Sequence, residues 1–289
     1  MAEAIAFPPG ADVAPPAPPA PAGRGRRRPN VMSVIWIIIV ATFFLLPLLG
    51  TAVFSLWAGG DRYNLTNYAA LVKTPEVWAS LWLSVQLAVY TVVISLTLLI
   101  PTVLFVRLRA PWLRPVLEVI SVMPFVIPPI ALIQGLTGLY SVPDAPLAMP
   151  IWFVSRPEFM VIGYVILSLP YSYRALDVGI SALDVSTLTQ AALSLGASWA
   201  QIFTRVIIPN LRTAILGATL LTFAIVLGEF VFANILLFNT FAVYINYIGQ
   251  VNGTEAAALS LFSFFVTWLG MLGILAGGGR GQVRTGGVG

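Results

Sequence analysis

The chain has 289 residues, of which 58% are hydrophobic and only 9% are charged, with a net charge of +4. A soluble domain carries roughly 25% charged residues, so this composition excludes a water-soluble enzyme and places the chain in lipid. The sequence contains no cysteine and no histidine. This excludes disulfide frameworks, thiol or imidazole catalysis, and metal sites built on those ligands. We therefore expect no catalytic residue and no metal site in the chain.

The first segment, 1–30, is rich in proline and alanine and ends in a cluster of arginines: Arg24, Arg26, Arg27 and Arg28. Without large apolar side chains such a segment cannot offset its ordering entropy, so we expect it to be disordered. The apolar run that follows, 31–57, is much longer than the roughly 7–15 residues of a signal-peptide core. We interpret this run as a retained membrane helix and the arginines as its cytoplasmic anchor, not as a nucleic-acid site.

A membrane-crossing helix needs roughly 20 mostly apolar residues. Six segments meet this requirement: 31–57, 80–105, 115–140, 158–176, 213–238 and 256–277. The third is interrupted by Pro124, Pro128 and Pro129, which free backbone carbonyls inside the span. This leaves two interpretations, a simple kink or a bent helix that lines a substrate path. The expected fold is all-α, a polytopic membrane protein with six transmembrane helices spread over 31–277.

The basic residues indicate how the spans are oriented. If the N-terminus is cytoplasmic and six spans alternate, twelve of the 15 Lys and Arg residues lie inside, and the positive-inside rule favours this orientation. The three residues left outside are Arg62, Lys73 and Arg156. Both termini are then cytoplasmic, with a flexible tail at 278–289. The outer loops are too short for a folded receptor domain: 58–79, 141–157 and 239–255.

The longest internal connection, 177–212, predicts a cytoplasmic helix-turn-helix. Asp184 or Ser186 can cap a first helix, and Gly196 can end it in a left-handed conformation. The apolar side chains of this helix recur at helical spacing and predict one apolar face: Val185, Leu188, Ala192 and Leu195.

A second short helix follows the glycine. Ser198 and Gln201 have the spacing of a capping box, and Pro209 is expected to stop the helix. Its apolar residues are Trp199, Ile202, Phe203 and Val206. Two interpretations stay open: the unit packs against the chain's own helices, or it docks into another protein.

The same segment resembles the EAA loop of type I ABC importer permeases. Ala191, Ala192, Gly196 and Pro209 match that pattern in register, while Gln190 stands where the family usually has glutamate. Glutamine keeps the hydrogen bonding but loses the charge. The flanking sequences are also similar to the family: Leu169-Pro170-Tyr171, Leu183-Asp184 and Gly228-Glu229-Phe230.

The resemblance implies a translocation subunit that is not itself an enzyme. It implies two ATPase subunits that hold ATP and Mg, a second permease (a heterodimer, or alternatively a homodimer), an external solute-binding protein, and a place in the bacterial inner membrane. This chain has no Gly-x-x-x-x-Gly-Lys-Ser/Thr phosphate loop of its own. The residues implied in ATPase coupling are Gln190, Ala191, Ala192, Gly196, Ser198, Trp199, Phe203 and Pro209.

The cargo is less defined. The third span and the Gly228-Glu229-Phe230 segment resemble the branch that imports polyamines, ferric iron, thiamine, phosphonates, sulfate and molybdate, and spermidine/putrescine permeases above all. Glu229 lies about 16 residues into the span 213–238. A carboxylate that deep in the membrane should face protein or water, so a structural hydrogen bond and contact with a cationic cargo both stay open. The candidate pathway residues are Glu229, Pro128, Pro129, Gln134 and Asn234.

Three other classes of protein are weighed against the importer. A channel or secondary transporter that works without ATP explains the spans but not the unit at 177–212. A membrane-embedded enzyme has little support, because histidine and cysteine are absent. A structural scaffold leaves the resemblance to the EAA loop unexplained.

Overall fold

The computed structural model describes residues 31–60 and 62–278. The segment 1–30, predicted to be disordered, lies outside the described residues, as does the predicted flexible tail 278–289 apart from Gly278, which ends α14. Contacts divide the chain into two units, up to Pro47 and from Leu48. Helix α1 (Val31–Leu56) runs through this boundary and is long and apolar enough to cross a membrane. Apart from one isolated bridge between Trp57 and Tyr63, the described residues form helices and no strands, which confirms the all-α prediction.

The long helices of the second unit are α3 (Pro75–Arg109), α7 (Met160–Ser181), α11 (Arg212–Leu227) and α14 (Gly253–Gly278). Helix α11 continues after a short break into α12 (Val231–Ile235). Within the described residues, five helical segments, α1 included, can cross a membrane. The chain is therefore a polytopic membrane protein, and α3 is longer than the predicted span 80–105.

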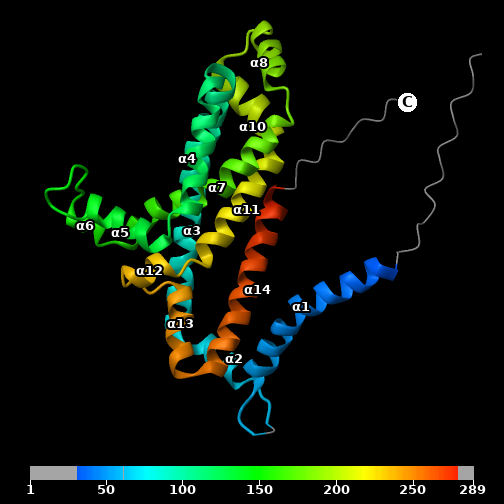
Figure 1. The fold of residues 1–289 in the computed structure, drawn as a ribbon, viewed down its shortest axis with the longest axis vertical. Helices are drawn as coiled ribbons and strands as arrows, with labels where there is room; N and C mark the ends of the chain where they lie inside the picture. The colour runs from blue at the N-terminus through cyan, green and yellow to red at the C-terminus, as the bar shows by residue number, and fades with distance from the viewer. Residues whose placement is uncertain (1–30, 61, 279–289) are drawn as a thin grey trace, which may run out of the picture. The chain divides into compact units, whose positions relative to one another are not determined.

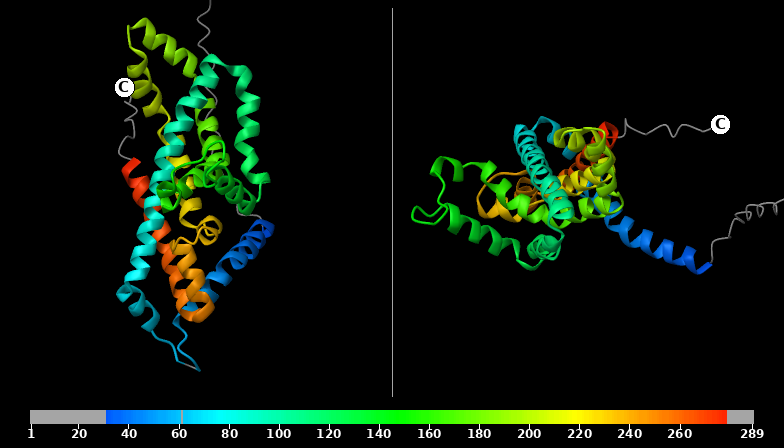
Figure 2. Two further views of the ribbon diagram at one scale, coloured as in Figure 1. Left: turned by 90° about the vertical axis from the view of Figure 1, so that its left-hand side faces the viewer. Right: turned by 90° about the horizontal axis from the view of Figure 1, so that it is seen from above.

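The third predicted span is two helices, not one. The chain bends by 108° at the break between α4 (Arg114–Val126) and α5 (Pro129–Tyr140), and the two helices count as a sixth span only if the pair is taken together. Ile127 and Pro128 both have extended backbones, with ψ of 119° and 137°. A residue before proline is driven out of the helical region, so the Pro128-Pro129 pair breaks the helix. The turn is visible in Figure 2, and it agrees with a bent segment better than with a simple kink.

Segments predicted as outer loops contain short helices. These are α2 (Thr66–Lys73), α6 (Ile151–Val154), the 3₁₀ turn η2 (Pro157–Phe159) and α13 (Phe241–Val251). Helix α13 packs against α3 and α14, with Phe241 and Tyr244 buried. The Phe241 backbone N–H donates to Ser84 Oγ at 2.9 Å. With 11 residues α13 is too short to cross the membrane, so it covers one end of the bundle.

Helices α3, α7 and α11 pack side by side and form the core of the second unit (Figure 1). Three apolar clusters follow one another along α3: the first contains Leu99, the second Leu87 and the third Leu81. Short polar side chains join the three helices between these clusters. The hydroxyls of Ser95 and Ser168 lie 3.1 Å apart, and those of Ser172 and Thr222 lie 2.6 Å apart. Small hydroxyl residues allow close helix approach in lipid and satisfy each other there.

Candidate functional site

The first leg of the 177–212 unit is helix α8 (Val185–Ser194), which begins as predicted at an Asp184 N-cap. The Asp184 carboxylate accepts the Thr187 hydroxyl at 2.6 Å and the Thr187 backbone N–H at 3.2 Å. These hydrogen bonds, with a further one from the Ser186 hydroxyl, hold the pKa of Asp184 below its usual range. The capping carboxylate is therefore ionised at neutral pH.

The end of α8 is a left-handed turn at Gly196, where φ is +78°. The Ala197 N–H donates to the Ala192 carbonyl at 3.0 Å, and the Gly196 N–H donates to the Leu193 carbonyl at 2.9 Å. This is the Schellman pattern, which satisfies carbonyls at a helix C-terminus. A Cβ atom at position 196 would meet no atom within 4 Å. The predicted glycine turn is confirmed, and backbone conformation alone restricts the position.

The two faces of α8 differ in burial. Of the predicted apolar face, Val185 and Ala192 are buried, whereas Leu195 is 88% exposed. Leu195 is the C-cap, the residue at which the helix ends. Gln190 and Ala191 are exposed. The outer surface of α8 and its turn is therefore open to a partner.

The second leg consists of α9 (Trp199–Gln201), the π-helical segment η3 (Ile202–Ile207) and α10 (Ile208–Asn210). The predicted capping box is present, since the Ser198 N–H donates to Gln201 Oε1 at 2.8 Å and the Gln201 N–H donates to Ser198 Oγ at 3.4 Å. The helical run ends at Asn210, one residue beyond Pro209, and a turn at Leu211 separates it from α11. The predicted end at Pro209 is therefore met to within one residue.

This second leg contacts the end of α3. The Arg109 guanidinium lies over the Trp199 ring, 5.4 Å from its centroid. Trp199 is 49% exposed, and Phe203 is half-buried. Together with Arg109 these two rings line an apolar hollow of about 380 Å³, whose other walls are Pro101, Leu104, Phe105, Leu108 and Ile207.

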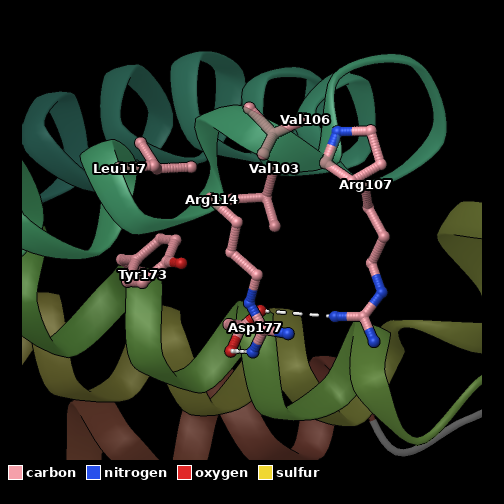
Figure 3. Close-up of a pocket in the computed structure, with 8 residues that line it drawn as sticks. Val103, Val106, Arg107, Arg114, Leu117, Tyr173 and Asp177 are labelled. Atoms are coloured by element: carbon pink, nitrogen blue, oxygen red, sulfur yellow. Dashed lines mark hydrogen bonds and ion pairs between the residues drawn. The ribbon is translucent and has the colours of Figure 1, made fainter.

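Helix α7 leads into α8, and a charged cluster surrounds Asp177 near the end of α7 (Figure 3). Asp177, with a side chain only 8% exposed, forms ion pairs of 3.4 Å with Arg107 and with Arg114. Arg107 also donates to the Ser181 hydroxyl at 2.7 Å, and Arg114 pairs with Glu118 at 3.1 Å. The cluster borders a pocket of about 230 Å³, which is also lined by Val103, Val106, Pro111, Leu117 and Tyr173.

Sequence reasoning used Arg107 and Arg114 only as markers of topology and missed Asp177. The one available signal was an acidic residue in a largely apolar segment. Its two partners lie 70 and 63 residues away in the chain, and no local pattern pairs residues at such separations.

The break between α11 and α12 holds the first candidate pathway residue. The Glu229 carboxylate accepts the Phe232 backbone N–H, with its two oxygens at 2.9 and 3.2 Å. Phe232 is buried and stacks on Tyr164, with 5.7 Å between the ring centroids. This hydrogen bond is local: it is made to the backbone three residues further on, in the first turn of α12.

The other pathway candidates lie on two helices that pack together. Helix α12 carries Asn234, and α5 carries Gln134 and begins at Pro129 after the Pro128 N-cap. Contacts join α12 to α5, and all four of these residues are exposed. The structure thus brings together two segments that are a hundred residues apart in the sequence. Each of the two segments, α5 and α12, directly follows a break in a membrane-spanning segment.

Comparison with known proteins places this architecture in a family. Residues 103–277, from the last two turns of α3 to the end of α14, match the family described as "Binding-protein-dependent transport system inner membrane component". The chain belongs to this family. The matched segment contains the whole 177–212 unit, the α4–α5 break and the α11–α12 break, so the family relationship covers every part of the candidate site.

Individual relatives are distant. The probable ABC transporter permease y4fN of Sinorhizobium fredii is 26% identical over 206 residues, which are 68% of this chain and 36% of the relative. The spermidine/putrescine permease PotB of Haemophilus influenzae is 29% identical over 216 residues, 70% of this chain and 74% of that one. The molybdenum permease ModB of Mycobacterium tuberculosis is 27% identical over 205 residues, with coverage of 68% and 74%.

The match does not extend over the whole of some relatives. It covers 36% of y4fN and 61% of PotB from Salmonella typhimurium, so the chain spans between about a third and three fifths of the length of these family members.

Solved structures share the fold. A bacterial ABC transporter involved in the import of the acidic polysaccharide alginate has a chain that superposes with a TM-score of 0.69 at 15% identity, covering 86% of this chain and 94% of that one. The alginate transporter in complex with a periplasmic protein bound to an alginate pentasaccharide gives 0.64 at 16% identity, with coverage of 84% and 91%.

Proposed function

We propose that the chain is a membrane permease subunit of an ABC importer, forming part of the solute path and passing the action of a separate ATPase to it. The observation that carries this proposal is the α8–Gly196–α9 unit, which lies at one end of the helical bundle with its outer surface open. Family membership supports the same function. The chain's own role is translocation, and hydrolysis of ATP with Mg belongs to the partner.

The unit is built to transmit force. Asp184 fixes the start of α8, the Gly196 turn fixes its end, and the Ser198 capping box fixes the start of the second leg. A short helix with both ends held moves as a rigid body rather than bending. We propose that an ATPase subunit grips the exposed Gln190, Ala191 and Leu195, so that its closure displaces α8 as one piece.

The proposed assembly has two ATPase subunits, a second permease and an external solute-binding protein. The end that bears α8 faces the cytoplasm in this proposal. Support comes from the basic residues, since the described arginines expected inside lie at the end of α3, the start of α4, the last two turns of α7, in η3 and at the start of α11. Of the three expected outside, Lys73 ends α2 just before α3 begins, Arg62 precedes α2, and Arg156 lies between α6 and η2. This distribution agrees with the positive-inside rule and with cytoplasmic termini.

Copurification tests the function directly. The tagged chain, expressed together with a candidate ATPase, second permease and binding protein, should be purified in detergent as a complex that hydrolyses ATP. In proteoliposomes, ATP hydrolysis should depend on the loaded binding protein, and uptake should depend on ATP. Uptake by the chain alone without ATP would instead support a secondary transporter and would defeat the importer proposal.

For the cargo we propose a polyamine such as spermidine or putrescine. The relatives named PotB support this, as does an acidic residue, Glu229, at the α11–α12 break. The ModB relative supports a second candidate, an oxyanion such as molybdate. Competition for binding-protein-dependent uptake separates the two: spermidine should compete and molybdate should not. The reverse result would replace the polyamine proposal while leaving the importer proposal intact.

A further inference from the structure

We propose that the turn between α3 and α4 is a brace, a rigid segment that holds the chain on both sides of α8 by two sets of side-chain contacts, with Asp177 and Trp199 as its positioning residues. This inference rests on the proposed importer function and adds a mechanical route to it. The turn is short and rigid, because the 3₁₀ segment η1 (Pro111–Leu113) joins the two helices. It presents Arg107, Arg109 and Arg114 within eight residues.

The first grip is on the chain entering α8. Arg107, in the last turn of α3, reaches both Asp177 and Ser181 on α7, and Ser181 is the final residue of that helix. Arg114, the first residue of α4, reaches the same Asp177 from the other side of the turn. One buried carboxylate therefore joins the end of α3, the start of α4 and the last two turns of α7 (Figure 3).

The second grip is on the chain leaving α8. Arg109 lies between the two arginines of the first grip in sequence, and its guanidinium covers the Trp199 ring at 5.4 Å. Trp199 is the first residue of α9, directly after the Ser198 cap. Stacking of an arginine on an indole ring is stabilising, and more so when the pair is shielded from water. The same turn thus holds the unit on either side of α8.

A brace of this kind gives α8 a route to the candidate pathway. Helix α4 starts at Arg114 and ends beside the Ile127–Pro128 break, 13 residues or about 20 Å further along. Because α4 also packs against α7, a displacement of α8 that moves Asp177 moves α4 with it. The proposal therefore predicts that coupling depends on the shared carboxylate and not only on the covalent connection through α7 and α11.

The chain offers a matched pair of variants on one arginine. Arg114 pairs with buried Asp177 and with Glu118, whose side chain is 45% exposed. Asp177→Asn and Glu118→Gln each remove one negative charge without changing the side chain's shape. An exposed ion pair between residues four apart contributes little, whereas loss of the buried charge leaves two guanidinium groups without their common partner.

The experiment uses the complete reconstituted transporter and measures solute taken up per ATP hydrolysed. Asp177→Asn should assemble normally but lower this ratio several-fold, Glu118→Gln should match the wild type, and Asp177→Glu should restore most of the ratio because it restores the charge. A merely structural role would change yield and melting temperature without changing the ratio. Wild-type coupling in Asp177→Asn would overturn the proposal.

Trp199 provides an independent test should Asp177→Asn fail to assemble. Trp199→Phe keeps an aromatic face for Arg109, and Trp199→Leu removes it while keeping apolar bulk. The leucine variant should couple less well than the phenylalanine variant, and equal coupling in the two would defeat the second grip. These outcomes are distinguishable from failure of the proposed function. If the wild type has no ATPase partner, the importer proposal is contradicted. If the wild type and all the variants take up the same amount of solute per ATP hydrolysed, only the brace proposal is contradicted.

Discussion

The Glu229 carboxylate caps the helix that follows it, accepting the Phe232 backbone N–H at 2.9 Å. Glu229 lies within a membrane-spanning segment, and both of its carboxylate oxygens accept from this one N–H. A lone carboxylate in the membrane costs about 2.5–3.5 kcal/mol on insertion scales, and hydrogen bonding to the chain offsets part of that cost. The capping role and a role toward a cationic cargo make different demands on the side chain.

Substitution at Glu229 separates these roles. Glu229→Gln keeps an oxygen that can accept from Phe232 but loses the charge, whereas Glu229→Ala loses both. We expect Glu229→Gln to lower uptake of a cationic substrate several-fold, with assembly and basal ATP hydrolysis intact, because the charge itself attracts the cargo. Unchanged uptake in Glu229→Gln, with a defect in Glu229→Ala, would assign the residue to capping alone and remove this internal support for a cationic cargo.

Gly196 is the next position to test. A β-branched residue forced into the left-handed region costs about 1–2 kcal/mol or more, and no neighbouring atom crowds the site. Gly196→Val should therefore insert normally and still weaken docking of the ATPase. Asparagine tolerates the left-handed region better than other residues, so Gly196→Asn serves as the control and should copurify with more ATPase than Gly196→Val. Equal copurification and equal transport-coupled hydrolysis in all three proteins would contradict the prediction.

The orientation of the chain can be read with single cysteines, because the protein has none of its own. A cysteine replacing Arg109, at the end of α3, should resist an impermeant thiol reagent added outside intact cells and should react once the membrane is opened. A cysteine replacing Arg62, an exposed residue before the start of α3, should react in intact cells. Rapid external labelling at 109 would reverse the proposed topology.

Gly163 on α7 is predicted to tolerate no larger side chain. A Cβ atom there would overlap the Phe232 ring and lie 3.1 Å from Leu136 Cδ1, so alanine would force apart α7, α12 and α5. Overpacking of this kind costs typically about 1–3 kcal/mol. Gly163→Ala should lower the melting temperature in detergent. Gly217→Ala is the matched control, since its Cβ would lie 3.9 Å from Ala175, and it should melt at or above the wild-type temperature.

The features that the sequence determined are those set within a few residues or by hydrophobic length. The Asp184 cap, the left-handed Gly196 turn and the Ser198–Gln201 capping box each depend on residues up to five positions apart, and all three are confirmed. The membrane helices follow from runs of apolar residues, because a helix is the structure that satisfies its own backbone in lipid. Local chemistry sufficed for these elements.

Tertiary structure decided how these elements meet. The sequence placed prolines in the third span, but the 108° bend between α4 and α5 is known only from the folded chain. The Asp177 cluster and the packing of α5 against α12 join residues that lie 63 to about a hundred positions apart. Such contacts depend on which helix faces are brought together, and helices that are apolar on nearly every side carry no periodic signal of that choice.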